Sequence, residues 1–318
     1  MSVLVFAETW EGNFKKATFE AVSYAKRIAD TYGDSVIAVT FGSVNDGTDL
    51  GAYGANKTVN VPNLTAFGND TFAGALAELA ESEGANTIVI SNTNYGGSVA
   101  PILAVKANAG LITNAVAVPE STSPLTVKRK SFSSKGFAFY KSQRDKNIIT
   151  IIPNAIGVEE FGGSAEAASH ETLNTASKMN SVSIDRAKGK IPLPEAELVV
   201  SAGRGLKGPE NWTMIEELAE TLDAGTACSK PVSDMGWRPH SEHVGQTGIA
   251  INPQLYIAIG ISGAIQHLAG VNASKNIVVI NKDPEAPFFK AADYGIVGDA
   301  FEVVPKLTEA IKNFKGNA

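Results

Sequence analysis

Short runs of β-branched apolar residues alternate with amphipathic runs along most of this chain. In its first third, strands are predicted at 2–8, 35–42 and 86–92, and helices at 14–33, 72–84 and 98–110. Strands that alternate with helices in this way indicate a parallel sheet covered on both faces. The fold class expected from the alternation is therefore α/β.

The pattern changes twice before residue 190. Residues 125–143 alternate polar and apolar side chains, as antiparallel edge strands do, and 147–153 are predicted to form a buried strand. Residues 158–190 are rich in Ser, Ala, Glu and Gly and poor in large apolar side chains, so we expect them to wrap or link. Because 318 residues exceed what one compact domain usually needs, we divide the chain into domains 1–190 and 191–318.

The alternation restarts after this boundary. Strands are predicted at 196–203, 255–261, 276–281 and 294–298, and helices at 209–223 and 303–314. The second domain is therefore expected to contain another mostly parallel, doubly wound sheet of Rossmann-like type.

Composition excludes several classes of protein. A net charge of -6 and a pI of about 5.4 argue against a nucleic-acid partner. No apolar run reaches the roughly 20 residues of a membrane-spanning helix, and the N-terminus lacks the basic segment of a signal peptide, so we expect a cytoplasmic protein. The single cysteine, Cys228, excludes a disulfide framework and a cysteine-held zinc or iron–sulfur centre within the chain. Any redox chemistry would then need an organic cofactor.

Sequence patterns of common enzymes are missing. The chain contains no G-x-S-x-G, G-x-x-x-x-G-K-[ST] or H-E-x-x-H sequence, and its four histidines lack the spacing of metal ligands. We therefore expect a site that binds a ligand rather than one that cleaves bonds.

Residues 203–208, GRGLKG, follow one predicted strand and precede a helix. The G-x-G-x-x-G pattern, with Asp223 at the distance of a ribose-binding acid, is typical of a dinucleotide site and leaves an NAD-dependent dehydrogenase open. However, the long side chains of Arg204 and Lys207 would crowd a pyrophosphate bound by the backbone. They favour a turn that brings positive charge to a phosphate, and the alternative is a glycine-rich turn with two solvated cations.

Residues 260–270, GISGAIQHLAG, follow a fully apolar strand. Ser262 is a candidate N-cap, which would leave free N–H groups for an anion, and Gln266 and His267 lie about one turn further on. Ligands of doubly wound sheets bind at the carboxyl ends of the strands. His267 is thus either a pocket residue or a core histidine bonded to a carbonyl, and its convergence with Ser262 and Gln266 favours the pocket.

Two other segments carry polar side chains at loops. Residues 243–248, HVGQTG, place Gln246 and Thr247 between glycines, either to bind a ligand or simply within a turn. Asn281 and Asp299 end neighbouring strands, where they either reach the hydroxyls of a ribityl or ribose chain or cap loops.

The sequence from VGQTG through QLYIAIGISGAIQHLAG to DYGIVGD (244–299), together with VVSAGRGLKGPENW (199–212), resembles the alpha subunit of electron transfer flavoproteins. The resemblance implies an electron carrier rather than an enzyme. It also implies one FAD, held mainly by the second domain, and a first domain that packs on a beta subunit containing AMP. The implied electron donors are flavin dehydrogenases, such as the acyl-CoA dehydrogenases of fatty acid β-oxidation, and the implied acceptor is a quinone oxidoreductase. An alpha subunit of an electron-bifurcating complex that oxidises NADH remains an alternative.

The resemblance also implies which residues contact FAD. Arg204 would meet the phosphates, and Ser229 and Lys230 would lie beside the flavin. The residues implied for the flavin ring, ribityl chain and pyrophosphate are Val244, Gly245, Gln246, Thr247, Ser262, Gly263, Ala264, Ile265, Gln266 and His267, and those implied toward the adenosine are Asn281, Asp299 and Ala300.

Lys230 departs from the family, which usually has arginine after the serine equivalent to Ser229. Lysine keeps the positive charge but lacks the planar, forked guanidinium. We therefore predict that this chain stabilises negative charge on a partly reduced flavin less than relatives with arginine do.

Overall fold

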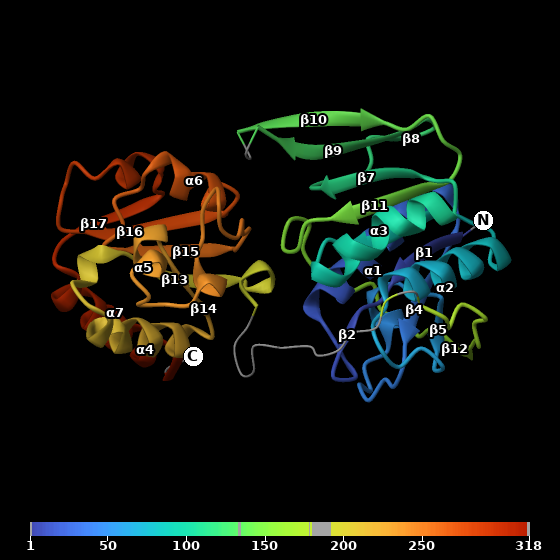
Figure 1. Cartoon of the computed structure of the whole chain (residues 1–318), viewed down its shortest axis with the longest axis horizontal. Coiled ribbons are helices and arrows are strands. Elements are labelled where there is room, and N and C mark those ends of the chain that lie inside the picture. Colours follow the sequence, from blue (N-terminus) through green and yellow to red (C-terminus); the bar gives the residue numbers. More distant parts are fainter. Residues whose placement is uncertain (1, 133–134, 178, 180–191, 317–318) are drawn as a thin grey trace. The chain divides into compact units, whose positions relative to one another are not determined.

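The computed structural model describes residues 2–132, 135–177, 179 and 192–316. These residues form two compact units, one containing most of the described residues before 180 and the other those from 192 onward (Figure 1). The domain boundary expected between residues 190 and 191 lies outside the described residues.

The first unit contains a ten-stranded mixed sheet. Its central strands are parallel, with the order β10-β9-β7-β11-β6-β1-β4-β5-β12, and β9 and β10 form the antiparallel edge that the alternation at 125–143 predicted. The strands are β1 (Ser2–Phe6), β4 (Ser35–Phe41), β5 (Lys57–Val61), β6 (Ala85–Ser91), β7 (Gly110–Ala115), β8 (Ser121–Thr122), β9 (Leu125–Ser131), β10 (Gly136–Lys141), β11 (Asn147–Ile151) and β12 (Glu166–Ser169); β2 (Thr9–Trp10) and β3 (Asn13–Phe14) form a separate hairpin.

Helices cover both faces of this sheet because successive strand side chains point to opposite sides. Helix α1 (Lys16–Tyr32) packs Tyr24 and Ile28 into the core on one face. Helices α2 (Asn69–Ser82) and α3 (Asn94–Lys106) pack into the core on the other. The short helix η1 (Leu50–Tyr53) lies in the connection between β4 and β5. The α/β fold class is thus confirmed in this unit.

Strand β12 corrects the expectation that residues 158–190 only wrap or link. Residues Glu166–Ser169 pair in parallel with β5 at the edge of the sheet, although three of the four side chains are exposed. An edge strand of this kind is held by backbone hydrogen bonds, so it needs no apolar pattern. That is why its sequence gave no signal.

The second unit contains a five-stranded parallel sheet with the order β14-β13-β15-β16-β17. In chain order this is 2-1-3-4-5, the flavodoxin-like form of the doubly wound sheet rather than the Rossmann order 3-2-1-4-5-6. Its strands are β13 (Leu198–Ala202), β14 (Gly225–Cys228), β15 (Leu255–Ile259), β16 (Asn276–Asn281) and β17 (Tyr294–Val297). Its helices are α4 (Thr213–Leu222), α5 (Lys230–Asp234), α6 (Ile265–Val271) and α7 (Ala300–Gly316), with short turns η2 (Leu193–Glu195), η3 (Arg204–Leu206), η4 (Pro209–Trp212), η5 (His240–Glu242) and η6 (Pro287–Ala291).

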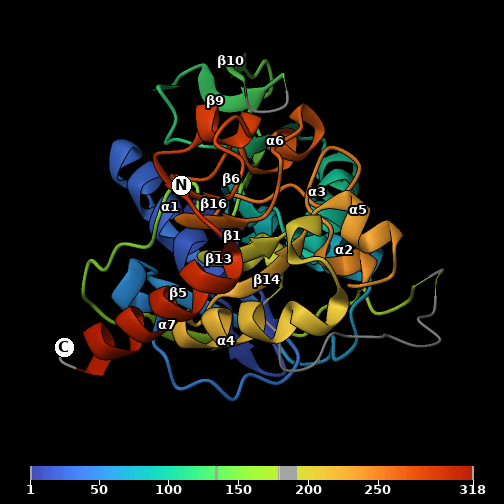
Figure 2. The same ribbon diagram turned by 90° about the vertical axis from the view of Figure 1, so that its left-hand side faces the viewer.

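The two faces of this sheet have separate cores. Helices α4 and α7 lie together on one face (Figure 2), where Leu218 and Val304 pack on Val200 and Ile257. Helix α6 and η6 cover the other face. The chain therefore continues to opposite faces of the sheet after the carboxyl ends of the neighbouring strands β13 and β15.

The segment 170–177, which we call the strap, follows β12 and is held on α2 by two carboxylates, those of Glu78 and of Asp70, which accepts from Ser177 Oγ at 2.8 Å. Glu78 binds His170 Nε2 at 2.9 Å, Thr172 Oγ1 at 2.6 Å and Asn174 Nδ2 at 2.7 Å. The hydrogen bond from Thr172 is the main cause that lowers the pKa of Glu78, and burial opposes it. The ionised carboxylate therefore fixes the strap.

We expect Glu78→Gln to loosen the strap without unfolding the unit. At neutral pH, amide exchange at Asn174 should become about fivefold faster, because roughly 1 kcal/mol of local hydrogen bonding is lost. The pKa of Glu78 in the folded protein lies below 4.5. The difference in exchange rate between Glu78→Gln and wild type should therefore be complete above pH 4.5 and should vanish as the pH falls through the folded pKa. Glu81→Gln, which removes only the Lys146 contact of an exposed carboxylate, is the matched control. Equal exchange in both variants would contradict this role for Glu78.

Candidate functional site

The backbones that follow β13 and β15 approach each other too closely for side chains. A Cβ atom on Gly203 would lie 2.4 Å from the Gly260 carbonyl oxygen, and one on Gly205 would lie 2.7 Å from the Gly260 Cα. Gly260 itself has φ +61°, which favours glycine. These two strands flank the point where the strand order reverses, the place where doubly wound sheets bind ligands.

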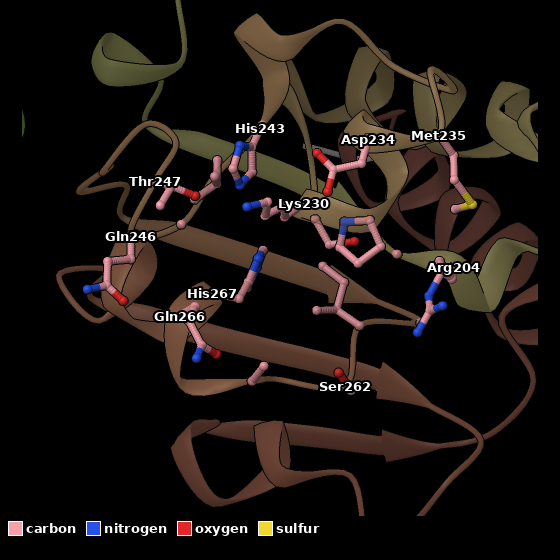
Figure 3. A pocket seen from close by; sticks show the side chains of 18 residues that line it. Arg204, Lys230, Asp234, Met235, His243, Gln246, Thr247, Ser262, Gln266 and His267 are labelled. Carbon is pink, nitrogen blue, oxygen red and sulfur yellow. The ribbon is translucent and has the colours of Figure 1, made fainter.

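A cavity of about 550 Å³ opens at this point, within the range of small-molecule sites. The residues that line it are Gly203, Arg204, Ser229, Lys230, Pro231, Asp234, Met235, His243, Val244, Gly245, Gln246, Thr247, Gly260, Ile261, Ser262, Ala264, Gln266 and His267. Figure 3 shows Arg204 at one end of the pocket and Gln246 and Thr247 at the other. Lys230, His243 and His267 lie between them in this view.

Most residues that the resemblance implies for FAD meet in this cavity, and five do not line it. Those five are Gly263, Ile265, Asn281, Asp299 and Ala300. The Asn281 side chain donates to the Ile261 carbonyl at 3.0 Å, and Asp299 accepts from the Phe301 N–H at 2.9 Å. Both polar side chains therefore satisfy loop backbone here.

Ser262 is not the N-cap of the following helix, which corrects that expectation. Helix α6 begins at Ile265 with Ala264 at its N-cap position and no side-chain cap. The chain turns at Gly263, with φ +82°, against Phe288, whose N–H donates to the Ser262 carbonyl at 3.1 Å. The tertiary contact with η6 therefore delays the helix start. Ser262 still lines the pocket, from the loop rather than from a helix.

The loop 243–248 is fixed at both ends by backbone hydrogen bonds. The Val244 N–H donates to the Cys228 carbonyl at 3.1 Å, and the Gln246 N–H donates to the Gln266 carbonyl at 2.7 Å. The loop thus spans from the end of β14 to α6. It holds Gln246 and Thr247 at the pocket wall.

His267 combines features of a core residue and a pocket residue. Its Nε2 atom lies 2.8 Å from the hydroxyl of Tyr256, and its Nδ1 atom is buried without a hydrogen-bond partner among the described residues. Burial is the main cause that lowers the pKa of His267 to about 4, and the nearby His243 lowers it further. The Val244 carbonyl near the ring acts in the opposite direction and raises the pKa. His267 is therefore neutral at neutral pH.

The two cations of GRGLKG point to different places. Arg204 lines the cavity, whereas Lys207, with φ +68°, places its ammonium 4.7 Å from the centre of the Phe301 ring. Within the described part of the chain, neither Arg204 nor Lys230 forms an ion pair with a carboxylate. The pocket therefore presents two cations to a ligand.

Sequence reasoning missed His243, Asp234 and Met235 as lining residues. The segment SKPVSD, with Pro231 directly after Lys230, has the start signal of the short helix α5. That signal could have placed Asp234 on a helix beside the pocket. Cys228, by contrast, is the buried apolar-type cysteine expected, and burial is the main cause that raises its thiol pKa to about 12.

A parallel sheet with a pocket at its switch point, here with two cations in the lining, is the arrangement in which α/β proteins hold nucleotide-like ligands. The model of the electron transfer flavoprotein domain matches residues 3–178, and that of the electron transfer flavoprotein FAD-binding domain matches residues 192–272. The chain belongs to the alpha-subunit family of electron transfer flavoproteins, as the resemblance indicated.

Several relatives match over nearly their whole length. Electron transfer flavoprotein subunit alpha of Bacillus subtilis is 38% identical over 98% of this chain and 97% of its own. The subunit alpha of Syntrophomonas wolfei is 34% identical over 97% and 98%. Protein FixB of Clostridium saccharobutylicum is 32% identical over 98% and 96%.

Among the described residues, no helix has the length and apolarity needed to cross a membrane. No group of three or more His, Cys, Asp or Glu side chains in that part of the chain is arranged to hold a metal ion.

Proposed function

We propose that this chain binds one FAD in the pocket of its second unit and carries electrons between flavin dehydrogenases and a separate acceptor. The observation that carries the proposal is that the pocket and the match to the FAD-binding domain occupy the same part of the chain. Every residue that lines the pocket lies between 203 and 267, inside the 192–272 match to the FAD-binding domain.

The residues present suit FAD. The pocket offers a cation for a diphosphate at Arg204, polar side chains for the ribityl hydroxyls at Ser262 and Gln266, and a hydroxyl and amide for the flavin ring at Thr247 and Gln246. The buried Nδ1 atom of His267 has no hydrogen-bond partner among the described residues, and in the tautomer that carries the proton there it would donate to a carbonyl of the cofactor. We assign Ser229, Lys230 and Val244 to Thr247 to the flavin end. Of the five residues that lie off the cavity, Gly263 and Ile265 would contact the pyrophosphate or ribityl chain of FAD through their backbone. Asn281, Asp299 and Ala300 would contact its adenosine side.

The chemistry divides between cofactor and protein. FAD, when bound, supplies a ring that accepts electrons and passes them on. Arg204 and the close-packed glycines orient the phosphates, while Lys230 and the N–H of His267 favour negative charge on the ring. Neutral His267 donates a hydrogen bond without adding a fixed charge.

The partners follow from the family. We propose a cytoplasmic heterodimer in which the first unit, through domain 1–190, packs on a beta subunit that holds AMP. Acyl-CoA dehydrogenases and similar flavoenzymes would reduce the FAD, and a quinone oxidoreductase would reoxidise it. The matches along the whole length of named alpha subunits support this assignment.

Stopped-flow mixing of the FAD-loaded complex with a substrate-reduced acyl-CoA dehydrogenase tests the carrier function. We expect the oxidised-flavin absorption of this protein to bleach and to return when an oxidised quinone oxidoreductase is added. Reduction by NADH alone would instead support the bifurcating alternative, and a flavin that neither donor reduces would contradict the proposal.

Replacing Lys230 with arginine should stabilise negative charge on the bound flavin more strongly. An arginine offers a forked, delocalised cation, so we expect the equilibrium constant for the first electron to rise about tenfold, the size of one charge-assisted hydrogen bond. An anaerobic redox titration measures it. Lys207→Arg, made at the cation that lies over Phe301, serves as the control, and identical titrations for all three proteins would refute the prediction.

A further inference from the structure

His243 is a buried histidine in the pocket wall that the cofactor assignment leaves without a role. His243 is only 1% exposed, and its Nδ1 atom has no hydrogen-bond partner among the described residues. The loop that it opens is folded around the ring, since a Cβ on Gly248 would lie 2.8 Å from Nδ1 and one on Gly245 would lie 3.4 Å from Nε2. A titratable group is thus enclosed beside the expected flavin end.

A second histidine connects this ring to solvent. His240 is exposed, and its ring centre lies 5.3 Å from that of His243. The Nδ1 atom of His240 lies 3.1 Å from the Ser233 hydroxyl, which fixes the ring against α5. The pair therefore places an exposed imidazole beside the buried one at the pocket wall.

The charges around His243 determine when it is protonated. Burial is the main cause that lowers the pKa of His243; His240 and Lys230 lower it further, and only Asp234 raises it. On the other side His267 is neutral, Cys228 stays protonated, and Glu242 is held by both Arg238 Nε and Nη2 at 2.7 Å. His243 is thus neutral near neutral pH before an electron enters the pocket.

Figure 3 shows the Lys230 ammonium and the rings of His243 and His267 directed toward the same part of the pocket. An electron placed there brings a negative charge close to a neutral imidazole that is screened poorly by water. The pKa of that imidazole must then rise.

We propose that His243 is a proton-accepting residue of this pocket, which takes up one proton from water through His240 when the first electron arrives. The inference rests on the proposed binding of FAD. A reduced flavoenzyme supplies the electron, which adds one negative charge to the cofactor, and bulk water supplies the proton, which makes His243 an imidazolium. The net charge of the pocket is unchanged, and the proton returns to water when the electron leaves.

Proton uptake can be counted directly with a pH-indicator dye, in weakly buffered solution at neutral pH, during photochemical reduction of the FAD-loaded complex by one electron. We expect His243→Gln to take up fewer protons than wild type, by up to one per electron. His240→Gln should take up the wild-type number more slowly, because it removes the path and keeps the acceptor. His170→Gln, in the first unit, should match wild type in both number and rate.

Equal uptake in wild type and His243→Gln would overturn the proposal. If that variant does not fold, histidine-labelled wild type gives the answer by NMR: the pKa of His243 should rise on reduction, and an unchanged pKa would overturn the proposal. Absence of bound flavin in wild type would instead count against the proposed function, so the two failures are distinguishable.

Discussion

Gly263→Ala is expected to lower the free energy of unfolding of the second unit by about 2–4 kcal/mol, the sum of left-handed backbone strain and overpacking. Gly263 has φ +82°, and an added Cβ would lie 2.4 Å from the Cβ of Phe288 and 2.5 Å from its Cα and N. Backbone atoms cannot move aside as a flexible side chain can. Denaturant unfolding followed by tryptophan fluorescence measures the loss.

Gly236→Ala separates strain from collision. Gly236 has φ +72°, yet a Cβ there would meet no atom within 4 Å. We expect this control to lose only about 1 kcal/mol, the cost of the left-handed conformation. Equal losses in the two variants would show that the contact with Phe288 does not shape the turn between Ser262 and α6.

Arg204→Gln is expected to raise the dissociation constant for FAD by about 10- to 100-fold, because one charge-assisted contact to phosphate is lost. Arg204 lies at the pocket end opposite Thr247 and has no carboxylate partner within the described residues. Equilibrium titration of the cofactor-free complex with FAD, followed by flavin fluorescence, measures the change.

Lys207→Gln is the matched control for Arg204. It removes the same charge from the same turn, but the Lys207 ammonium lies over Phe301 and the residue does not line the pocket. Its dissociation constant should stay within about twofold of wild type, since a distant exposed charge is screened. A loss equal to that of Arg204→Gln would mean that general positive charge, not a phosphate contact, governs affinity.

The elements with strong periodicity could be predicted from the sequence. Val199 and Val200 are neighbours in β13 and point into the two different cores of the sheet. Because both faces of the strand are buried, its sequence is an unbroken apolar run, which can be recognised. The edge strand β12 could not be predicted, because its exposed side chains carry no period and its pairing depends on β5.

The site likewise contains residues that could be predicted from the sequence and others that could not. Thr247 and Gln246 could be placed in the pocket because two glycines mark their loop and the family resemblance implies that this loop contacts the ligand. The start of α6 could not, because the contact of Gly263 with Phe288, 25 residues later, decides where the helix begins. His243 gave no local signal either, since only the fold brings its ring beside Lys230 and His267.

The central claim is that FAD occupies the pocket at the ends of β13 and β15. The most direct test is to purify the chain with its beta subunit and count FAD released per chain on denaturation, for wild type, Lys207→Gln and Arg204→Gln dialysed against the same low FAD concentration. We predict one FAD per chain in wild type and Lys207→Gln and a clear deficit in Arg204→Gln. A wild-type complex without FAD, or one whose FAD content is the same in all three proteins at every concentration, would contradict the claim.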